Sequence, residues 1–212
     1  MSEALRDKYA TQNAEQTVAL EDGFSIRRYS QFARHLPPEA IDVLDIGCAE
    51  GRGGAHLKSL CPRIRLAGLD CVEERLAELP SSYDGRILGL TNAIPVDDRS
   101  MDAIVAGEFL EHLYPSDVDP TLCEFQRILR IGGKLLMTTP NPHSLNMRRR
   151  KGTVYGVAHL TQHFPRVLAG RLKMHGFSGI RIRGSGQMSS LVGEHFPWLS
   201  VYGSYLITGV KY

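Results

Sequence analysis

One loop, between a predicted strand and a predicted helix, constrains this chain more than any other segment. Residues 42–46 read Asp-Val-Leu-Asp-Ile and predict a strand, Gly47 and Gly51 then open a turn, and residues 53–60 follow a helical pattern. A strand that ends in a glycine-rich turn and leads into a helix brings backbone N–H groups close to a ligand. The loop therefore predicts a site for a nucleotide-type cofactor.

The spacing of the glycines indicates which kind of cofactor. A dinucleotide-binding turn follows G-x-G-x-x-G, but the next two glycine positions after Gly47 are occupied by Ala49 and Arg52. The charge of Asp45 would repel a pyrophosphate, whereas it suits the ammonium of an amino-acid group. The pattern D-x-G-x-x-x-G resembles the first motif of the class I S-adenosylmethionine (SAM)-dependent methyltransferases.

Further blocks resemble the same family, in the same order along the chain. Residues 64–70 predict a second strand that ends in an acid, and residues 94–113 end in E-x-x-E-H-L, the signature of one large subgroup. Residues 124–141 resemble that subgroup's helix, glycine turn and fifth strand, which closes in T-P-N, and residues 159–164 resemble its later histidine-containing segment. The subgroup includes ubiquinone-pathway and glycan-associated O-methyltransferases.

The resemblance implies a set of cofactor contacts. Asp45 and the turn would surround the methionine part, Asp70 would accept hydrogen bonds from both ribose hydroxyls, and Glu108 would lie on the sulfonium side. Asp70 could instead be an ordinary helix N-cap. Many relatives bind the adenine amino group with an Asp where this chain has Leu90, so adenine would be held by backbone groups, by Thr91 or Asn92, and by apolar packing. The implied cofactor-binding residues are Asp45, Gly47, Cys48, Ala49, Gly51, Asp70, Cys71, Leu90, Thr91, Asn92, Glu108 and Phe109.

Two carboxylates and two imidazoles are the candidate groups for catalysis of methyl transfer. On a helix beginning near residue 108, Glu108, Glu111 and His112 would share one face, and His159 could meet them from a loop. Glu111, His112 and His159 are the candidate catalytic residues, because a hydroxyl acceptor needs a group that takes its proton.

The same four side chains, Glu108, Glu111, His112 and His159, also suit a divalent metal such as Mg, Mn or Zn. They resemble the metal-binding set of the plant small-RNA 2′-O-methyltransferases. In a simpler interpretation, Glu111 and His112 support loops, and Glu108 contacts the cofactor through its backbone.

Other polar residues have weaker functional interpretations. His163 follows His159 at a metal-ligand spacing but lacks the Glu of a metalloprotease motif, so it is left unassigned. Asn141 and His143 lie just past the predicted fifth strand, where they could orient a hydroxyl of the acceptor or cap the turn.

Two later segments could contact an acceptor. The basic residues within 147–151 would bind a phosphate or carboxylate, or would form a solvated loop. The aromatic residues Trp198, Tyr202 and Tyr205 could stack on a sugar ring, although core packing is their commoner role.

Composition limits the class of protein. With 212 residues, of which 42% are hydrophobic, the chain can bury the core of one α/β domain. The net charge of +2 is too balanced to indicate a nucleic-acid partner. The four cysteines form no C-x-x-C pair, which favours buried free thiols in a reducing compartment. No apolar run approaches a membrane span and no signal-peptide core is present, so we expect a cytoplasmic protein.

The alternation of strand and helix patterns predicts an α/β fold with a single Rossmann-like, mostly parallel sheet, helices on both faces and an antiparallel last strand. Residues 1–38 would form a helical leader that covers the cofactor site, with helices at 4–20 and 25–36. Residues 39–212 would form the SAM-binding methyltransferase domain, with an acceptor-binding insertion at about 141–163. Seven strands are expected, at 42–46, 64–69, 86–90, 102–106, 133–139, 178–183 and 204–211.

These patterns favour a SAM-dependent O-methyltransferase that acts on a small polar molecule or on a sugar unit of a glycan or glycolipid. Two alternatives stay open. One is metal-dependent 2′-O-methylation of RNA, which the balanced charge disfavours, and the other is a catalytically silent SAM-binding subunit or sensor. A nicotinamide oxidoreductase would share the sheet but not the glycine spacing. The sequence carries no motif that identifies the acceptor or the oligomeric state.

Overall fold

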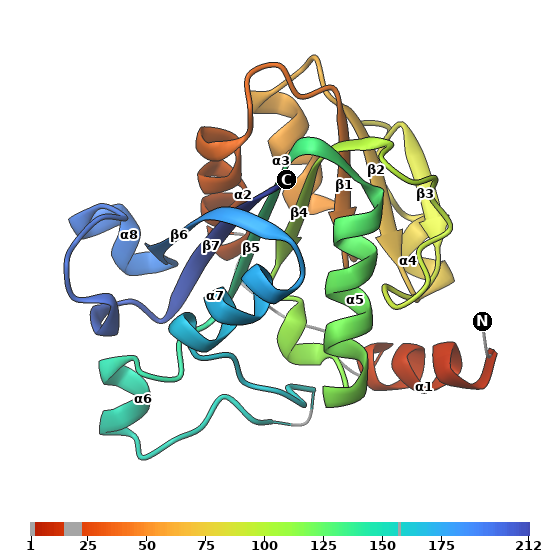
Figure 1. The fold of residues 1–212 in the computed structure, drawn as a ribbon. Helices are drawn as coiled ribbons and strands as arrows, with labels where there is room; N and C mark the ends of the chain where they lie inside the picture. Colours follow the sequence, from red (N-terminus) through yellow and green to blue (C-terminus); the bar gives the residue numbers. More distant parts are fainter. Residues whose placement is uncertain (1–2, 15–22, 157) are drawn as a thin grey trace.

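The fold is built around one seven-stranded sheet with the strand order β3-β2-β1-β4-β5-β7-β6 (Figure 1). The structure is a computed structural model that describes residues 3–14, 23–156 and 158–212. Only β7 runs antiparallel to its neighbours, β5 and β6. The predicted fold class, with its antiparallel last strand, is thereby confirmed. The strands are β1 Asp42–Ile46, β2 Arg65–Asp70, β3 Gly85–Leu88, β4 Met101–Gly107, β5 Leu129–Pro140, β6 Phe177–Ser185 and β7 Ser204–Lys211.

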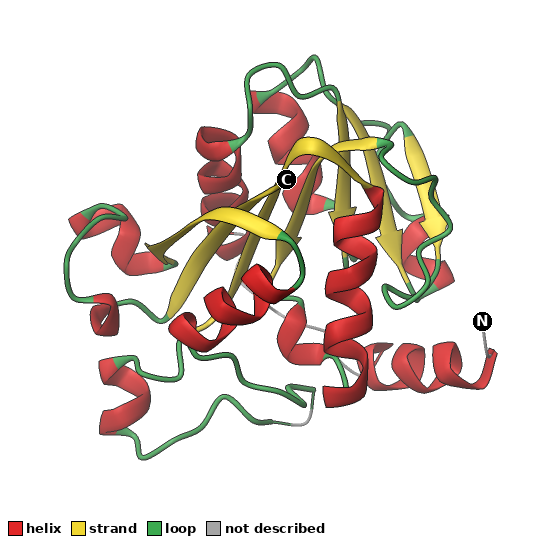
Figure 2. Cartoon of the chain, viewed as in Figure 1, coloured by secondary structure: helices red, strands yellow, loops and turns green. Residues whose placement is uncertain are grey.

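Helices cover both faces of the sheet (Figure 2). Two helices near the N-terminus precede β1, and α1 is described as far as Ala14; the rest of the helix predicted to residue 20 lies outside the described residues. Pro165 opens α7, where its missing N–H costs no intrahelical hydrogen bond. The helices are α1 Glu3–Ala14, α2 Gly23–His35, α3 Arg52–Leu60, α4 Glu73–Ala77, α5 Pro115–Ile128, α6 Leu145–Arg149, α7 Pro165–Met174 and α8 Gln187–Val192, with 3₁₀ turns η1 Leu110–His112 and η2 Leu199–Val201.

Each face of the sheet has its own apolar core. On one face, side chains of α5 and α7 such as Leu122, Phe125 and Leu172 pack against the sheet. On the other face, Phe32 of α2 and Leu57 of α3 pack against β1, β2 and β4. All five side chains are fully buried, which fixes the helices against the sheet and therefore fixes the ends of the strands.

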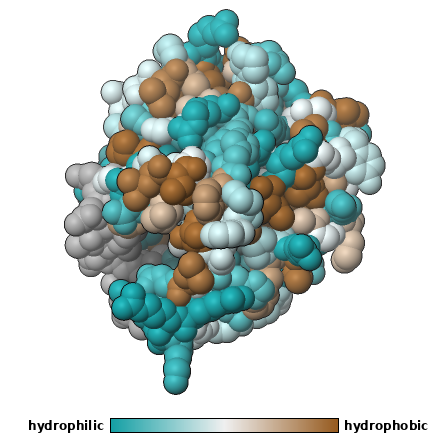
Figure 3. All heavy atoms as spheres, turned by 90° about the vertical axis from the view of Figure 1, so that its left-hand side faces the viewer, coloured by the Kyte–Doolittle hydropathy of each residue, from teal (hydrophilic) through white to brown (hydrophobic). Residues whose placement is uncertain are grey.

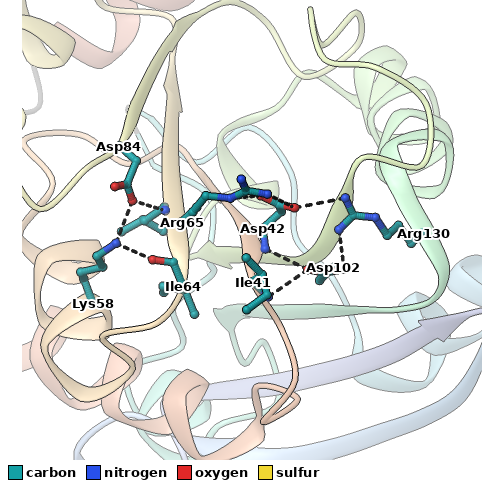
Figure 4. A network of polar contacts seen from close by, with 9 residues as sticks. Ile41, Asp42, Lys58, Ile64, Arg65, Asp84, Asp102 and Arg130 are labelled. Atoms are coloured by element: carbon teal, nitrogen blue, oxygen red, sulfur yellow. Dashed lines mark hydrogen bonds and ion pairs between the residues drawn. The ribbon is translucent and has the colours of Figure 1, made fainter.

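A network of charged groups ties together the N-terminal ends of the strands (Figure 4). The Asp102 carboxylate accepts the backbone N–H groups of Ile41 and Asp42 at 2.9 and 2.8 Å. The Arg130 guanidinium bridges Asp102 and Asp42, and Arg65 forms a two-pronged pair with Asp42. These contacts stabilise the edge of the sheet opposite the glycine-rich turn, and they leave the carboxyl ends of the strands for ligand binding.

All four cysteines are free thiols. The prediction that they are buried holds for Cys48, whereas Cys61 and Cys71 are half-buried and Cys123 is exposed. Exposure of Cys123 follows from its place on the solvent side of α5. Within the ranges that the structure describes, no helix combines the length and apolar character needed to cross a membrane.

Candidate functional site

A cavity of about 510 Å³ opens at the carboxyl ends of β1, β2 and β4. Its volume lies within the range of roughly 300–1,000 Å³ that is typical of small-molecule sites. The α1 and α2 helices also contribute to the wall, through residues such as Tyr9 and Arg28. The predicted residues that line the cavity are Gly47, Cys48, Ala49, Gly51, Asp70, Cys71, Leu90, Thr91, Asn92, Glu108, Phe109, His112 and His159.

The glycine-rich turn after β1 forms one wall of the cavity because its backbone adopts left-handed conformations. The φ angles of Gly47, Ala49 and Gly51 are 64°, 47° and 76°. A Cβ atom at Gly47 would lie 2.7 Å from the Phe109 ring, and one at Gly51 would lie 2.6 Å from the Leu79 side chain. Glycine is therefore required at both positions by conformation and by space.

Asp70, at the end of β2, anchors the turn to the neighbouring strand. One carboxylate oxygen accepts the backbone N–H of Ala49 at 3.0 Å, and the other accepts that of Val72 at 3.0 Å. Val72, and not Asp70, is the N-cap residue of α4, so the alternative that Asp70 is an ordinary helix N-cap is wrong. Because each oxygen can accept a second hydrogen bond, Asp70 can still receive a ribose hydroxyl in the cavity.

Asp45 lies beneath the turn, fully buried, and is not part of the cavity wall. Its two carboxylate oxygens accept hydrogen bonds from the Tyr29 hydroxyl at 2.6 Å and the Tyr83 hydroxyl at 2.5 Å. Burial raises the pKa of Asp45 to about 7, against the lowering effect of the two tyrosines. A direct contact between Asp45 and the ammonium of a bound amino acid would require one hydroxyl to move, so that assignment stays a prediction.

The two thiols in the cavity wall are unsuited to nucleophilic chemistry. Burial raises the pKa of Cys71 to about 12, and burial with the nearby Asp45 raises the pKa of Cys48 even further. The thiolate is the reactive form of cysteine, and at neutral pH both groups are thiols. Their role is to fill space beside the turn.

The far end of the cavity, where adenine was expected, is bounded by polar groups that bond to one another. Thr91 is buried and shares a 2.8 Å hydrogen bond with Thr121, and Asn92 donates to Asp117 at 3.3 Å. Asp117 also accepts a 2.6 Å hydrogen bond from the hydroxyl of Tyr9, on α1. Asp117 therefore belongs to the cavity wall, and no sequence motif identified it.

Glu108 does not begin a helix, which corrects the expectation that Glu108, Glu111 and His112 share one helical face. Its φ of 53° is left-handed, so the chain turns sharply after β4 and the 3₁₀ turn η1 starts only at Leu110. The Glu108 carboxylate instead lies 3.8 Å from the Arg28 guanidinium and accepts a 3.3 Å hydrogen bond from Ser204. A non-glycine residue in this conformation stores backbone strain, a frequent feature of ligand sites.

Glu111 is fully buried behind the cavity wall. One carboxyl oxygen accepts a 3.0 Å hydrogen bond from Thr139 on β5, and the other has no partner among the described residues. Burial and the negative charge of Glu108 raise the pKa of Glu111 well above its ordinary value. An unpartnered buried carboxyl oxygen is costly, and a bound hydroxyl or cation would remove that cost.

His112 and His159 present the same ring nitrogen to the site. The Nδ1 atom of His112 lies 3.1 Å from the Ala158 carbonyl oxygen, and that of His159 lies 3.0 Å from the Val154 carbonyl oxygen. A carbonyl oxygen only accepts, so Nδ1 carries the hydrogen in both rings and Nε2 keeps its lone pair. Burial, with a contribution from His159, lowers the pKa of His112 to about 4, which keeps its ring neutral at physiological pH.

Glu111, His112 and His159 form the group that meets the distance criterion for a metal ion among the described residues. One ligand atom from each lies within 4.8 Å of the others, whereas Glu108 is not part of the group. The predicted four-residue metal set is therefore reduced to three residues by the turn at Glu108. Hydrogen bonds from Nδ1 to backbone carbonyls are the usual support of metal-ligating histidines.

The polar residues with weaker interpretations lie outside the cavity wall. The Asn141 side-chain amide donates to the carbonyl oxygens of Leu199 and Tyr202, at 2.9 and 3.2 Å, so it caps the turn rather than facing an acceptor. The ring of His143 packs on Phe164, with centroids 4.8 Å apart. His163 is buried and shares a 2.9 Å hydrogen bond with Thr161.

The aromatic residues of the last segment do not form one surface. Tyr202 and Tyr205 are fully buried, and their hydroxyls donate to the carbonyl oxygens of Gly193 and His163. Trp198 alone of the three is exposed. The core-packing interpretation therefore applies to both tyrosines, because they lie at or next to β7 between the sheet and its covering loops.

Several side chains of the cavity wall were not predicted individually. Tyr9, Phe24, Ser25, Arg28 and Tyr29 come from the two helices that precede β1. The sequence predicted only that these helices lie over the site. No motif marks the individual residues, since their positions follow from how α2 packs against α3 and β4.

Comparison with known proteins gives relatives of this chain in sequence and in fold. Residues 44–137 match the family model described as "Methyltransferase domain". A probable S-adenosylmethionine-dependent methyltransferase of Mycolicibacterium smegmatis is 31% identical over 125 residues, which cover 57% of this chain and 47% of that protein. A malonyl-[acyl-carrier protein] O-methyltransferase of Methylococcus capsulatus is 30% identical over 159 residues, which cover 70% of this chain and 56% of that protein. The chain thus spans about half the length of these curated relatives.

The solved structures show the same architecture. A SAM-dependent methyltransferase of Thermotoga maritima, described as a possible histamine N-methyltransferase, superposes with a TM-score of 0.74 at 20% identity, over 96% of this chain and all of that one. The described chain therefore has the fold of the class I SAM-dependent methyltransferases, and residues 44–137 are the part that resembles the methyltransferase family model.

Proposed function

We propose that this chain, which carries a methyltransferase domain on the class I fold, transfers the methyl group of SAM to an oxygen of a small polar molecule or of a sugar unit in a glycan or glycolipid. The observation that carries the proposal is the grouping of Glu111, His112 and His159 within 4.8 Å of one another, with both histidines in the wall of the cofactor-sized cavity and Glu111 behind it. Both imidazoles keep Nε2 as an acceptor, which is the form that takes a proton from a hydroxyl.

The cavity supplies what a bound SAM needs. The left-handed turn from Gly47 to Gly51 brings the backbone close to the methionine part, and Asp70 offers carboxylate oxygens for the ribose hydroxyls. Phe109 lies against Gly47, on the expected sulfonium side. Aligning the acceptor, the methyl carbon and the sulfur can lower the barrier by about 7–11 kcal/mol.

His112 or His159 would take the one proton of the acceptor hydroxyl as its oxygen bonds to the methyl carbon. The bond from that carbon to sulfur would break in the same step and leave S-adenosylhomocysteine. General-base assistance of this kind is worth about 10²- to 10⁴-fold in rate. The carbonyl oxygens of Ala158 and Val154 hold the two rings in the tautomer that is needed, so no rearrangement precedes the proton transfer. Glu111, behind them, would accept a hydrogen bond through its unpartnered oxygen.

Two observations support oxygen as the acceptor atom. A neutral base is required for a hydroxyl, while an amine can attack without one, and the structure provides two imidazoles for that role. In addition, the Methylococcus capsulatus relative is named an O-methyltransferase. The preference for a sugar rests on the E-x-x-E-H-L and T-P-N segments and on the basic residues of 148–151, which resemble those of glycan-associated methyltransferases.

A screen of acceptors tests the proposal. Nucleotide sugars, glycans, phenolics, hydroxy acids and amines are incubated with methyl-labelled SAM, and the products are identified by mass spectrometry. We expect label on a hydroxyl-derived oxygen, and its transfer should be lost in His112→Ala. Label on nitrogen would contradict the assignment of the acceptor atom. Binding of S-adenosylhomocysteine without turnover of any acceptor would favour the silent SAM-binding subunit, and label on RNA would favour the 2′-O-methyltransferase.

The same three side chains also fit a divalent cation, which we propose as a second, metal-assisted version of the reaction. A carboxylate and two imidazoles with free Nε2 atoms are a suitable donor set for Mn or Zn. A bound cation would lower the pKa of an acceptor hydroxyl. Calorimetric titration with Mn²⁺ or Zn²⁺ tests this version directly: saturable binding that is lost in Glu111→Gln supports it, and activity that persists after dialysis against a chelator would exclude it.

A further inference from the structure

One side of the molecule exposes a group of apolar side chains. Leu191 and Val192, at the end of α8, are 73% and 39% exposed, and Phe196 and Trp198, in the loop to η2, are 37% and 68% exposed. We call these four residues the apolar patch. Figure 3 looks at this side and shows hydrophobic side chains gathered at the surface above a strongly hydrophilic lower edge. Grouped exposure of this kind marks an interaction surface.

The apolar patch rests on a fixed support. The Phe196 and Trp198 rings meet edge to face with centroids 5.6 Å apart. Beneath them, the buried Tyr202 hydroxyl donates to the Gly193 carbonyl oxygen at 2.5 Å and accepts the Phe196 N–H at 3.2 Å. The loop is therefore held in place with its aromatic side chains pointing outward.

The acid closest in sequence to the patch does not add negative charge to this surface. The Glu194 side chain is only 12% exposed, and its carboxylate lies 2.6 Å from His35 and within ion-pair distance of Arg34 and Arg183. It also accepts a 2.7 Å hydrogen bond from Gln31. Glu194 is neutralised by its neighbours on α2 and β6.

A basic cluster lies next to the apolar patch. It consists of residues 148–151, Arg-Arg-Arg-Lys, which are all exposed and form no ion pair with any described residue. Arg148 and Arg149 end α6, and the other two residues follow it. The α6 helix packs against η2, which begins directly after Trp198. The same helix carries Leu145, which is 54% exposed. Exposed apolar and cationic side chains thus lie on neighbouring segments of the fold.

The distribution of charge along the sequence reinforces this cluster. Residues 1–124 contain 12 Lys and Arg against 22 Asp and Glu, a net charge of −10, whereas residues 125–212 contain 13 Lys and Arg against Glu194 alone, a net charge of +12. The overall charge of +2 is therefore the sum of an acidic first part and a basic second part of the sequence. The basic cluster therefore belongs to a part of the sequence whose excess of positive charge favours an anionic partner.

We propose that the apolar patch and the basic cluster together dock this chain on a membrane surface that carries anionic lipid headgroups. Tryptophan and phenylalanine insert at the boundary between headgroups and hydrocarbon, while arginine and lysine pair with the headgroup charges. Figure 1 shows α8 and its loop projecting from the body of the fold. A projecting surface suits a fluid bilayer, which needs no matching shape, better than it suits a groove on a protein.

Docking in this way would bring the site to the membrane. A short segment leads from the basic cluster to His159 in the cavity wall. A hydroxyl on a membrane-bound molecule would then meet the cavity without leaving the bilayer surface. The docking itself requires neither SAM nor turnover, so its test is independent of the proposed reaction.

Trp198 gives a direct test because it is the only tryptophan in the chain. The full chain is mixed with vesicles of phosphatidylcholine alone or of phosphatidylcholine with phosphatidylglycerol, and its fluorescence and co-sedimentation are measured. We expect a blue shift of the emission and co-sedimentation with the anionic vesicles, both weakened by added salt. Neither should occur with phosphatidylcholine alone.

Matched variants separate the two parts of the surface. Arg148→Gln combined with Arg149→Gln should weaken binding to anionic vesicles roughly thirtyfold. Arg63→Gln combined with Arg99→Gln removes the same charge from exposed positions elsewhere and should have little effect. Phe196→Ser keeps the fluorescent reporter and should reduce the blue shift, with Leu191→Ser as a second patch variant. Three results would each overturn the proposal. The first is no binding to anionic vesicles, which is expected if the partner is an acidic protein. The others are equal binding to both vesicle types and unchanged binding in the patch variants.

Discussion

The imidazole rings of His112 and His159 meet edge to face with their centroids 4.9 Å apart. The two residues are far apart in the sequence, since His112 lies 46 residues before Ala158, the neighbour of His159. The two rings come from η1 and from the segment before α7, and each is oriented by a backbone carbonyl oxygen. This pairing places two imidazoles at one point of the cavity wall. Burial lowers the pKa of His112, and the neighbouring His159 ring lowers it further.

Replacement of either histidine should affect turnover more than cofactor binding. In His112→Ala or His159→Ala we expect the rate with the acceptor found in the screen to fall by about 10²- to 10⁴-fold. The affinity for S-adenosylhomocysteine should stay within about threefold, because binding relies on the turn and on Asp70. His143→Ala, on the exposed side of the turn, is the control and should keep full activity. Parallel losses of binding and rate would show that the two rings are structural.

Asp70 should be required for cofactor affinity. We predict that Asp70→Ala weakens S-adenosylhomocysteine binding by roughly tenfold or more, since it removes both the proposed ribose contact and the anchor of the Ala49 backbone N–H. Isothermal titration calorimetry measures the effect. Asp97→Ala, at an exposed position in the loop before β4, is the matched control. Unchanged affinity in Asp70→Ala would remove the ribose assignment.

The tyrosine pair around Asp45 should stabilise the fold. Tyr83→Phe deletes a hydrogen bond to a buried carboxyl group, so the free energy of unfolding should fall by about 1–3 kcal/mol. The pKa of Asp45 should rise further, because the Tyr83 hydroxyl lowers it in the native protein. Urea denaturation gives the change in stability, and Tyr212→Phe, at an exposed position, serves as the control. Equal stability of the two variants would contradict this role.

The stability of the protein should depend on the protonation of His112. Its folded pKa is about 4, against an unfolded value near 6.5, so the unfolded chain binds a proton first as the pH falls. The contribution of the neutral ring is therefore complete above about pH 6.5 and is lost between there and pH 4, at a cost of up to about 3 kcal/mol.

The difference in unfolding free energy between the native protein and His112→Gln isolates this effect from that of Asp45. The pKa of Asp45 is raised to about 7, so its contribution changes in the opposite direction, falling as the pH rises from about 4 to 7. Since Asp45 is present in both proteins, it cancels in the difference. A difference that does not vary between pH 4 and 6.5 would show that His112 titrates normally.

The fold could be predicted because its signals are local. The seven strands alternate with helical patterns, and every predicted strand overlaps an observed one, beginning with β1 at residues 42–46. Boundaries were less certain: β5 starts at Leu129 rather than 133, because its first residues pair with Met101 before a register shift. Such pairing depends on the neighbouring strand and leaves no mark in the hydrophobic pattern.

The site could be predicted only in part. The turn, Asp70 and the histidines follow motifs, whereas the partners of Asp45 come from Tyr29 and Tyr83, which are 16 and 38 residues away. The left-handed backbone of Glu108 replaced the expected helix start, because the chain must turn between β4 and η1. Contacts of this kind depend on how helices pack on the sheet, which the sequence pattern does not specify.

A crystal structure of the chain with S-adenosylhomocysteine tests the central claim most directly. We predict that the ligand fills the cavity with its ribose hydroxyls against Asp70, its methionine part on the turn from Gly47 to Gly51, and its sulfur toward the His112 and His159 rings. A ligand bound outside this cavity, or a ribose turned away from Asp70, would contradict the account.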